Sequence, residues 1–305
     1  MNQKIFVTGA GGYLGRSIAA RLARAGHEVV GMVRNASHAE ALQRVGVQPL
    51  VSDLLKPESF VSVLKNCDAA VHASFANDGS PAVPDQLALA AFADAAEDGR
   101  LRRLLYTSSL WVHGDPQGAT IDESTPLAPT ELSQWRAAHE DVVMDLSMHE
   151  VTPVVFRPGI VYGGSRGLFG AWFREARDHN TVTYWGDGSQ VWSCVHVDDV
   201  AEAYRLGLEH AKPCDRFLLA DGAPFTVREL AEAVANAAGA TARPWNADEV
   251  VQSLGTYGQA LLSGARVQAA KARRELGWVP RHTSFVAEVG ELYREWMDAH
   301  GARVS

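Results

Sequence analysis

The 305-residue sequence contains only three cysteines, no apolar run of about 18 residues, and no excess of basic side chains. Cys67, Cys194 and Cys214 have neither metal-ligand spacing nor a C-x-x-C pair, which predicts buried thiols and no metal site. No membrane-spanning segment is expected, and the net charge of −8 argues against a surface for nucleic acid or anionic lipid. The amino terminus carries no export signal, so we expect a cytoplasmic protein.

Short apolar runs that read as strands alternate with helical segments along the chain. The expected strands are residues 5–7, 28–33, 48–51, 68–72, 104–108 and 153–157. This alternation predicts an α/β fold, a Rossmann-type doubly wound parallel sheet with a smaller C-terminal substrate lobe. We expect an NAD(P)-binding domain in residues 1–165, with return segments near 195–212. Residues 166–305 would form mainly the substrate lobe, interleaved with the first domain.

Helical periodicity and turn residues complete the expected layout. The expected helices are residues 13–25, 85–97, 200–210 and 231–242, and residues 76–84 are expected to be a loop. Strand-like pieces at 182–184 and 216–219 are assigned to the substrate lobe. Asp198 and Asp199 are predicted to cap the helix that follows them. His72 lies inside an apolar run, which favours a core residue whose hydrogen bonds are satisfied.

The segment from Ile5 onward leads from a strand directly into a turn with the spacing G-x-x-G-x-x-G. In a strand–turn–helix unit, Gly9 permits the tight turn, Gly12 lets backbone N–H groups approach a pyrophosphate, and Gly15 lets the helix lie close to the sheet. Tyr13 and Leu14 begin that helix, whose free N–H groups attract an anion. The segment predicts a dinucleotide site; the alternative is a tight turn without a ligand.

Further coenzyme contacts are expected where later strands end. Arg34 follows the second strand, where an acidic residue favours NAD and an arginine accommodates the 2′-phosphate of NADP. The sequence therefore predicts NADP, with NAD as the alternative. Asp53, followed by Leu54, either accepts from the adenine amino group or caps the helix that begins near residue 57. Ala73 borders the coenzyme and Ser74 the substrate at the end of the fourth strand.

Several segments, taken in order, resemble the extended short-chain dehydrogenase/reductase family, which includes NAD(P)-dependent epimerases and dehydratases. They are residues 8–15, 108–109, 112–114, 122–126, 156–163, 186–190, 195–200 and 271–280. The resemblance implies an enzyme that transfers hydride between a dinucleotide and a small molecule. It also implies a homodimer formed through the helix within residues 131–149.

The family's usual acid–base pair is missing from this chain. Members use a tyrosine and, four residues later, a lysine on the same helix face, but the sequence contains no Tyr-x-x-x-Lys. Aligned on residues 137–140, Leu132 occupies the tyrosine position and Arg136 the lysine position. Arg136 can still bind the coenzyme ribose, but Leu132 cannot carry a proton, and an arginine stays protonated. The usual mechanism is therefore absent.

Other residues could replace the missing acid. By analogy with the family, Ser109 polarises a substrate carbonyl through a hydrogen bond. His113 titrates near neutral pH and follows this serine, so we take it as the best replacement donor. Tyr162 and His139 are weaker candidates. For each histidine and tyrosine the alternative is a structural role, in loop hydrogen bonding, packing or a solvated helix face.

The substrate is expected to be apolar. Sugar-nucleotide members carry a phosphate-binding arginine where this chain has Trp192. Trp111, Trp192, Leu132 and Ser74 are taken as substrate residues, within a larger set of aromatic residues in segments that the family places around the substrate. The other members are Trp135, Trp172, Trp185, Phe169 and Phe173. Aromatic walls favour an apolar carbonyl compound, although some of these rings must belong to the core.

Three functions are compatible with these residues. The first is an NADP(H)-dependent oxidoreductase that acts on a small apolar or aromatic carbonyl or alcohol and uses a non-standard proton donor. The second is a dinucleotide-binding sensor or interaction protein without catalysis. The third is a sugar-nucleotide epimerase or dehydratase with a displaced acid.

Overall fold

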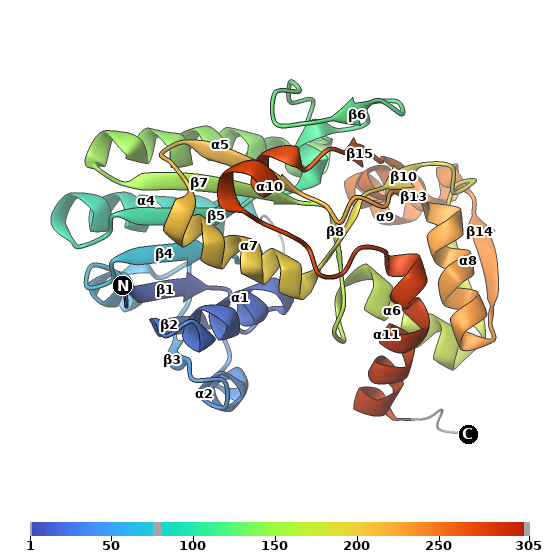
Figure 1. The fold of residues 1–305 in the computed structure, drawn as a ribbon, viewed down its shortest axis with the longest axis horizontal. Coiled ribbons are helices and arrows are strands. Elements are labelled where there is room, and N and C mark those ends of the chain that lie inside the picture. Colours follow the sequence, from blue (N-terminus) through green and yellow to red (C-terminus); the bar gives the residue numbers. More distant parts are fainter. Residues whose placement is uncertain (1, 76–80, 302–305) are drawn as a thin grey trace.

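The computed structural model describes residues 2–75 and 81–301, and its centre is a seven-stranded parallel sheet. The strands are β1 Lys4–Thr8, β2 Glu28–Val33, β3 Gln48–Val51, β4 Ala69–His72, β5 Arg103–Thr107, β7 Thr152–Pro158 and β12 Asp215–Leu219. Their order is β12-β7-β5-β4-β1-β2-β3 (Figure 1). The order reverses between β1 and β4, which is the position where doubly wound sheets bind ligands. The predicted fold class is confirmed.

Helices cover both faces of this sheet. One face carries α1 Tyr13–Arg24, α2 Ala39–Gln43, α7 Val197–His210 and α10 Ala270–Leu276, and the other carries α3 Val61–Leu64, α4 Ala82–Asp98 and α5 Gln134–Asp145. Each face has its own apolar cluster, built from strand residues that alternate between the two sides. The strands are consequently apolar along their length, as expected for a parallel sheet buried on both faces.

A second lobe begins where β7 ends, at the carboxyl edge of the sheet (Figure 1). Its helices are α6 Gly167–His179, α8 Val227–Ala238, α9 Ala247–Leu262 and α11 Phe285–His300. Its strand pairs are β8 Ile160–Tyr162 with β11 Cys194–His196, β9 Thr181–Trp185 with β14 Thr241–Trp245, and β10 Val191–Trp192 with β13 Phe225–Thr226. A further pair joins β6 Thr120–Ile121 to β15 Arg266–Val267. Aromatic side chains dominate its core.

Two elements of the second half differ from the sequence prediction. Residues 216–219, assigned to the lobe, belong to β12, an edge strand that pairs in parallel with β7. The helix predicted at 231–242 is α8, which begins earlier because Thr226 and Glu229 form a reciprocal capping box. It ends at Gly239, whose φ of +67° suits glycine, and β14 then continues the chain.

The helix predicted at 200–210 also begins earlier, at Val197. Its cap is His196, whose ring accepts from the backbone N–H of Asp198, so the prediction that Asp198 and Asp199 cap it was wrong. The Asp199 carboxylate instead accepts hydrogen bonds from the backbone N–H groups of Arg281 and His282. Helix α4 begins at residue 82, inside the expected loop, and residues 76–80 of that loop lie outside the described residues.

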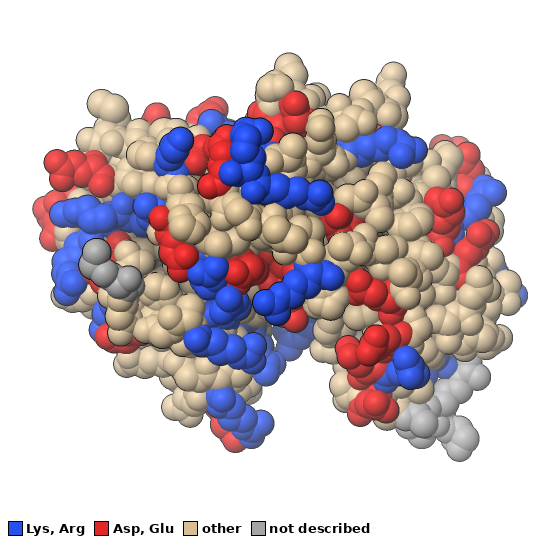
Figure 2. Space-filling model, in the orientation of Figure 1, with Lys and Arg blue, Asp and Glu red and all other residues tan. Residues whose placement is uncertain are grey.

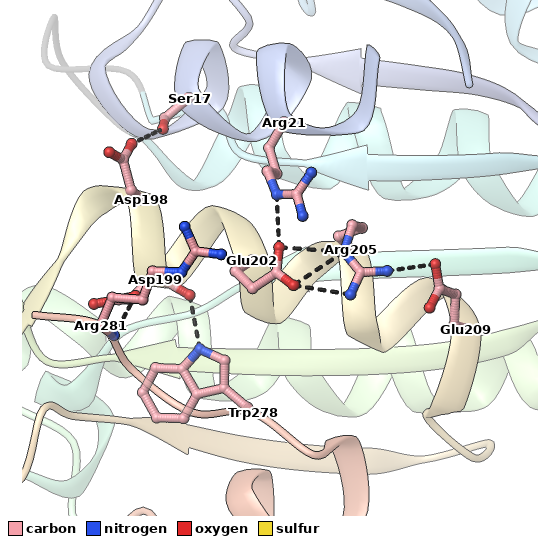
Figure 3. A network of polar contacts seen from close by, with 9 residues as sticks. All are labelled: Ser17, Arg21, Asp198, Asp199, Glu202, Arg205, Glu209, Trp278 and Arg281. Carbon is pink, nitrogen blue, oxygen red and sulfur yellow. Dashed lines mark hydrogen bonds and ion pairs between the residues drawn. The ribbon is translucent and has the colours of Figure 1, made fainter. Parts of the chain in front are cut away.

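Polar contacts attach α7 to α1, the helix that follows the glycine turn (Figure 3). The Arg21 guanidinium lies 2.6 Å from the Glu202 carboxylate, and Ser17 donates to Asp198 at 3.2 Å. On the other side of α7, the Trp278 indole donates to the backbone carbonyl of Asp199 at 2.8 Å. Helix α1 is thus held from behind by elements far along the chain.

Surface and thiol features follow the composition with one exception. Lys and Arg are interspersed with Asp and Glu over the face shown in Figure 2. Across residues 2–75 and 81–301, no helix has both the length and the apolarity needed to cross a bilayer. Cys67 and Cys194 are buried as predicted, but Cys214 is exposed. It lies in the turn before β12 with a φ of +65°.

One buried carboxyl makes stability depend on pH. Asp221, 4% exposed, follows β12, and burial raises its pKa to about 7. Its protonated form stabilises the fold at low pH, and this contribution is lost as the pH rises from about 4 to 7.

We therefore expect Asp221→Asn to gain stability relative to the wild type over that range and to keep the gain above pH 7. A difference of about 2 kcal/mol between pH 5 and 8 is expected, to be measured by urea unfolding. A difference that does not vary with pH would contradict this assignment.

Candidate coenzyme and catalytic site

The glycine turn brings backbone segments so close together that side chains do not fit. Gly9 has a φ of +67°, and a Cβ there would lie 2.6 Å from the carbonyl oxygen of Ala73. A Cβ on Gly15 would lie 2.3 Å from the carbonyl oxygen of Gly9. These contacts place the start of α1 directly against the ends of β1 and β4. The tight turn expected at Gly9 and the close helix–sheet approach expected at Gly15 both require this geometry.

The first turn of α1 is open to an anion. Gly12 is its N-cap and provides no side-chain acceptor, and the first turn contains no acidic residue. The backbone N–H groups of Tyr13 and Leu14 therefore keep their capacity to bind a phosphate. The side chain of Tyr13 has a structural role, because its hydroxyl donates to the carbonyl of Gly163 at 2.6 Å.

A cavity of about 750 Å³ lies at the reversal point of the sheet. Of the residues predicted from the sequence to bind coenzyme or substrate, it brings together Gly9, Gly12, Arg34, Asp53, Leu54, Ala73 and Ser74. Asp53 does not cap the helix near residue 57, whose N-cap is Lys56; its carboxylate accepts from the N–H of Leu55. The cavity also contains His38 and Arg166, which sequence reasoning missed. No local motif marks these two positions.

The residues aligned with the family's catalytic positions lie near the ends of β5 and at the start of α5. Ser109 accepts from the N–H of Trp111 at 3.2 Å and caps the turn 110–113, which leaves its hydroxyl hydrogen able to point elsewhere. Arg136 is 7% exposed and donates to the carbonyl of Thr107 at 2.6 Å. Leu132 lies in a short 3-10 turn just before α5. The structure contains no proton carrier at that position.

The Arg136 guanidinium is surrounded by aromatic rings. Its central carbon lies 4.4 Å from the ring centroid of Trp135 and 5.5 Å from that of Phe75. These two rings stack with their centroids 6.5 Å apart. Cation–π contacts of this kind favour an arginine whose charge is partly desolvated. Because Phe75 follows β4 and Arg136 belongs to α5, the cluster connects the edge of the coenzyme cavity to the catalytic helix.

The structure does not favour His113 as the proton donor. Its side chain is 3% exposed, and its Nε2 accepts from the Arg157 guanidinium at 3.1 Å. Burial, together with the charge of Arg157, lowers the pKa of His113 to about 4. The ring is therefore neutral near pH 7 and has no imidazolium proton to donate. Arg157 is itself held by the buried carboxylate of Glu140, so this group is structural.

Tyr162 and Trp192 belong to the core of the lobe, which corrects their predicted roles as acid and substrate residue. Tyr162 is fully buried, and burial raises its pKa far above the ordinary value. Trp192 is 1% exposed and donates to the carbonyl of Ser263 at 3.0 Å. It packs against Trp172 and Trp185, with centroids 6.2 and 5.4 Å away. Phe169 and Phe173 lie in the same apolar cluster.

Trp111 is placed differently, because it lies between the two lobes. Its ring meets Tyr257 of α9 edge to face, with centroids 6.2 Å apart. Its carbonyl accepts from the hydroxyl of Ser133, one residue after Leu132. This pair of rings forms an aromatic wall beside the catalytic positions, in addition to the rings of Trp135 and Phe75. Tyr257 was missed in the sequence, since it lies far from every motif of the family.

A buried polar network also lies beside the site. His72 is 1% exposed and bonds to Thr8 and Asp85, which confirms it as a core residue with satisfied hydrogen bonds. Asp85, at the start of the helix expected at 85–97, is 3% exposed and also bonds to His139. In the described part of the chain, one group has potential metal-ligating atoms within 4.8 Å of one another: His196, Asp198 and His282. Its imidazoles stack in near-parallel planes, so their lone pairs do not converge on one ion.

Comparison with known proteins identifies the family. Residues 5–220 match the family model "NAD dependent epimerase/dehydratase family", and the chain belongs to this family. This confirms the resemblance seen in the sequence and an NAD(P)-dependent enzyme of the short-chain dehydrogenase/reductase type.

Three relatives illustrate the range of this family. A 4-hydroxy-2-methyl-3-oxo-4-farnesyl-3,4-dihydroquinoline-1-oxide ketoreductase of Stigmatella aurantiaca is 28% identical, over 92% of this chain and 93% of its own. A 2-alkyl-3-oxoalkanoate reductase of Stenotrophomonas maltophilia is 27% identical, over 78% and 76%. A dTDP-glucose 4,6-dehydratase of Streptomyces venezuelae, crystallised with NAD, superposes with a TM-score of 0.83 at 20% identity, covering 96% of both chains. The last likeness concerns the fold; the expected homodimer stays a prediction.

The position of Trp192 leads to a test that separates core from substrate roles. We expect Trp192→Phe to lower the free energy of unfolding by about 2 kcal/mol, through lost packing and an unpaired Ser263 carbonyl. Coenzyme affinity and the KM for a substrate should stay unchanged. The matched variant Trp111→Phe should instead raise KM with little loss of stability. Thermal unfolding and steady-state kinetics distinguish the two, and a raised KM in Trp192→Phe would restore the substrate role.

Proposed function

We propose that the protein is an NADP(H)-dependent reductase that transfers hydride to the carbonyl group of a small, largely apolar compound. The observation that carries the proposal is the cavity at the β1–β4 reversal point, which is lined by Gly9 and by Gly12, the N-cap of α1. These features fit a dinucleotide, because the glycine turn lets a pyrophosphate approach the backbone and the helix end offers free N–H groups.

The choice of NADP rests on the end of β2. Arg34 lies in the cavity together with Asn35, His38 and Ser52, and no acidic residue follows β2 directly. An arginine in this position complements a 2′-phosphate, whereas NAD enzymes place an acidic residue there to bind the 2′-hydroxyl. The Asn35 side chain is already used, since it accepts from the N–H of Ser37. Arg34 is therefore the principal candidate for discrimination between the two coenzymes.

The residues of this chain would divide the work as follows. When bound, the nicotinamide supplies the hydride. The Tyr13 and Leu14 N–H groups would hold the pyrophosphate, and Arg136 would orient the nicotinamide ribose from its fixed position above Trp135. Ser109 would donate a hydrogen bond to the substrate carbonyl oxygen and stabilise the negative charge that develops there.

The proposed substrate class follows from the walls beside these positions. Trp111, Leu132 and Tyr257 are apolar or aromatic, and Ser74 adds one hydroxyl at the end of β4. Such a lining suits a ketone with an aromatic or alkyl body better than a doubly charged sugar nucleotide. The names of two curated relatives, a ketoreductase of a farnesylated quinoline and a 2-alkyl-3-oxoalkanoate reductase, point in the same direction.

The substrate class can be tested by incubating the protein with NADPH and a panel of carbonyl compounds. The panel contains branched β-keto acids, aryl ketones, aldehydes and, as a control, dTDP-glucose and UDP-glucose. We expect NADPH oxidation with the apolar ketones and no conversion of the sugar nucleotides. Coenzyme binding without turnover across the panel would favour the sensor hypothesis. Conversion of a sugar nucleotide alone would favour an epimerase or dehydratase.

The coenzyme preference has its own test. We expect Arg34→Ala to weaken NADPH binding by roughly tenfold or more, since a charged hydrogen bond contributes about 1.5–3 kcal/mol. NADH binding should stay within about twofold. Arg24→Ala, at the far end of α1, serves as the control. Titration calorimetry measures the affinities of the wild type and both variants for NADPH and for NADH. Equal losses for the two coenzymes in Arg34→Ala would contradict the role of Arg34.

A further inference from the structure

A carboxylate buried beside the catalytic helix receives three side-chain hydrogen bonds. Asp85, in the first turn of α4, lies 2.9 Å from His72 Nε2, 2.9 Å from the Tyr106 hydroxyl and 2.6 Å from His139 Nδ1. These partners come from β4, β5 and α5, so the network joins four elements. A buried charge is retained only when it is paired and hydrogen-bonded, as here. The Asp85 carboxylate is thus held in one position by three side chains.

An ionised Asp85 carboxylate can only accept hydrogen bonds, so His72 donates to it from Nε2 and Tyr106 donates from its hydroxyl. Thr8 Oγ1 accepts from the N–H of Ala73 and lies 2.8 Å from His72 Nδ1. Burial by itself would raise the pKa of Asp85, but His72 and His139 hold it well below the ordinary value. The carboxylate is consequently an acceptor for His139 as well.

This arrangement leaves one ring nitrogen of His139 available. Nδ1–H is directed to Asp85, and Nε2 has no hydrogen-bond partner among residues 2–75 and 81–301. The side chain retains 14% of its exposure. An imidazole oriented by a carboxylate at one nitrogen can take up and donate a proton at the other.

The position of His139 connects it to the catalytic residues. Its ring meets Trp135 edge to face, with centroids 5.3 Å apart, and the other contacts of Trp135 are with Arg136 and Phe75. His139 lies in α5, seven residues after Leu132, which belongs to the 3-10 turn before that helix. About two helical turns therefore separate it from the position where the family carries its acid. His113 also has a ring nitrogen without a partner, Nδ1, but its side chain is 3% exposed and the Arg157 guanidinium donates to its other nitrogen.

We propose that His139 is the acid–base group of this enzyme and that Asp85 is its positioning residue; the proposal rests on the reductase function proposed above. In the reduction, the bound dinucleotide would supply the hydride for the new C–H bond, and the carbonyl π pair would move to oxygen. The proton on His139 Nε2 would reach that oxygen through bridging water molecules, and solvent would reprotonate the imidazole. Asp85 stays ionised throughout and stabilises the imidazolium, while Arg136 remains the ribose ligand.

Two substitutions test the pair with the ketone that gives the highest turnover. His139→Gln removes the acid. Asp85→Asn keeps a carbonyl oxygen as acceptor for Tyr106 and His139, which share Oδ2, but removes the negative charge that stabilises the imidazolium. We expect kcat to fall by at least about 100-fold in each variant. The double variant should be no slower than His139→Gln, because Asp85 acts only through the histidine.

Further measurements exclude a merely structural effect. NADPH affinity, measured by calorimetry, should stay within about threefold in both variants. Added imidazole should restore turnover to His139→Ala, since a free imidazole can occupy the space left by the ring. His149→Gln, an exposed histidine in the 3-10 turn directly after α5, is the matched control and should turn over like the wild type.

The outcomes separate this inference from the function on which it rests. Full turnover by His139→Gln would overturn the inference and leave the reductase function standing. Parallel loss of NADPH affinity and kcat, without rescue by imidazole, would assign Asp85 and His139 a structural role and would also overturn it. If the wild type oxidises no NADPH with any ketone, the reductase function fails and the inference falls with it.

Discussion

Helix α1 lies against the loop that precedes it with no space for a side chain between them, and the nucleotide-binding end of the molecule depends on this contact. Gly9 and Gly15 meet through backbone atoms alone, and Gly9 also lies against the end of β4. Any β-carbon at these positions would separate the helix from the strands and displace its N–H groups from the anion position. One ion pair and one hydrogen bond from α7 support the helix on its other side (Figure 3). The anion site is therefore rigid before coenzyme arrives, which lowers the entropic cost of binding.

Around this rigid site the sequence departs from the pattern of its family. Leu132 removes the tyrosine proton, and Arg136 replaces a lysine with a cation that stays charged and is held by Thr107 and two aromatic rings. Asp85 brings a counter-charge and an oriented imidazole to the same helix. An altered acid–base group, an apolar wall and a preserved dinucleotide cavity are compatible with each other. The family's architecture can thus keep hydride transfer while the proton takes another route.

Most strands of the central sheet and the tight glycine turn could be predicted from the sequence because each depends on short-range patterns, whereas β12 was assigned to the wrong lobe. Apolar runs mark buried parallel strands, and glycine spacing marks a backbone approach that other residues do not permit. The roles of Tyr162 and Trp192 could not be predicted in this way, since both lie in segments that border a substrate site and a core alike. Their burial shows the core assignment. His113 was predicted as the replacement proton donor, and only the fold showed that it is buried beside Arg157.

By itself the sequence determined the fold class and the family, it predicted where a dinucleotide would bind, and it showed that the usual tyrosine and lysine are missing. Only the tertiary structure decided which side chains share one buried space. Thr8, His72, Asp85 and His139 come from separate elements and match no local pattern. Seven strands and their covering helices must pack before these groups meet. The reason is physical: local patterns encode which face of an element is buried, whereas hydrogen bonds between distant elements depend on how those faces are brought together.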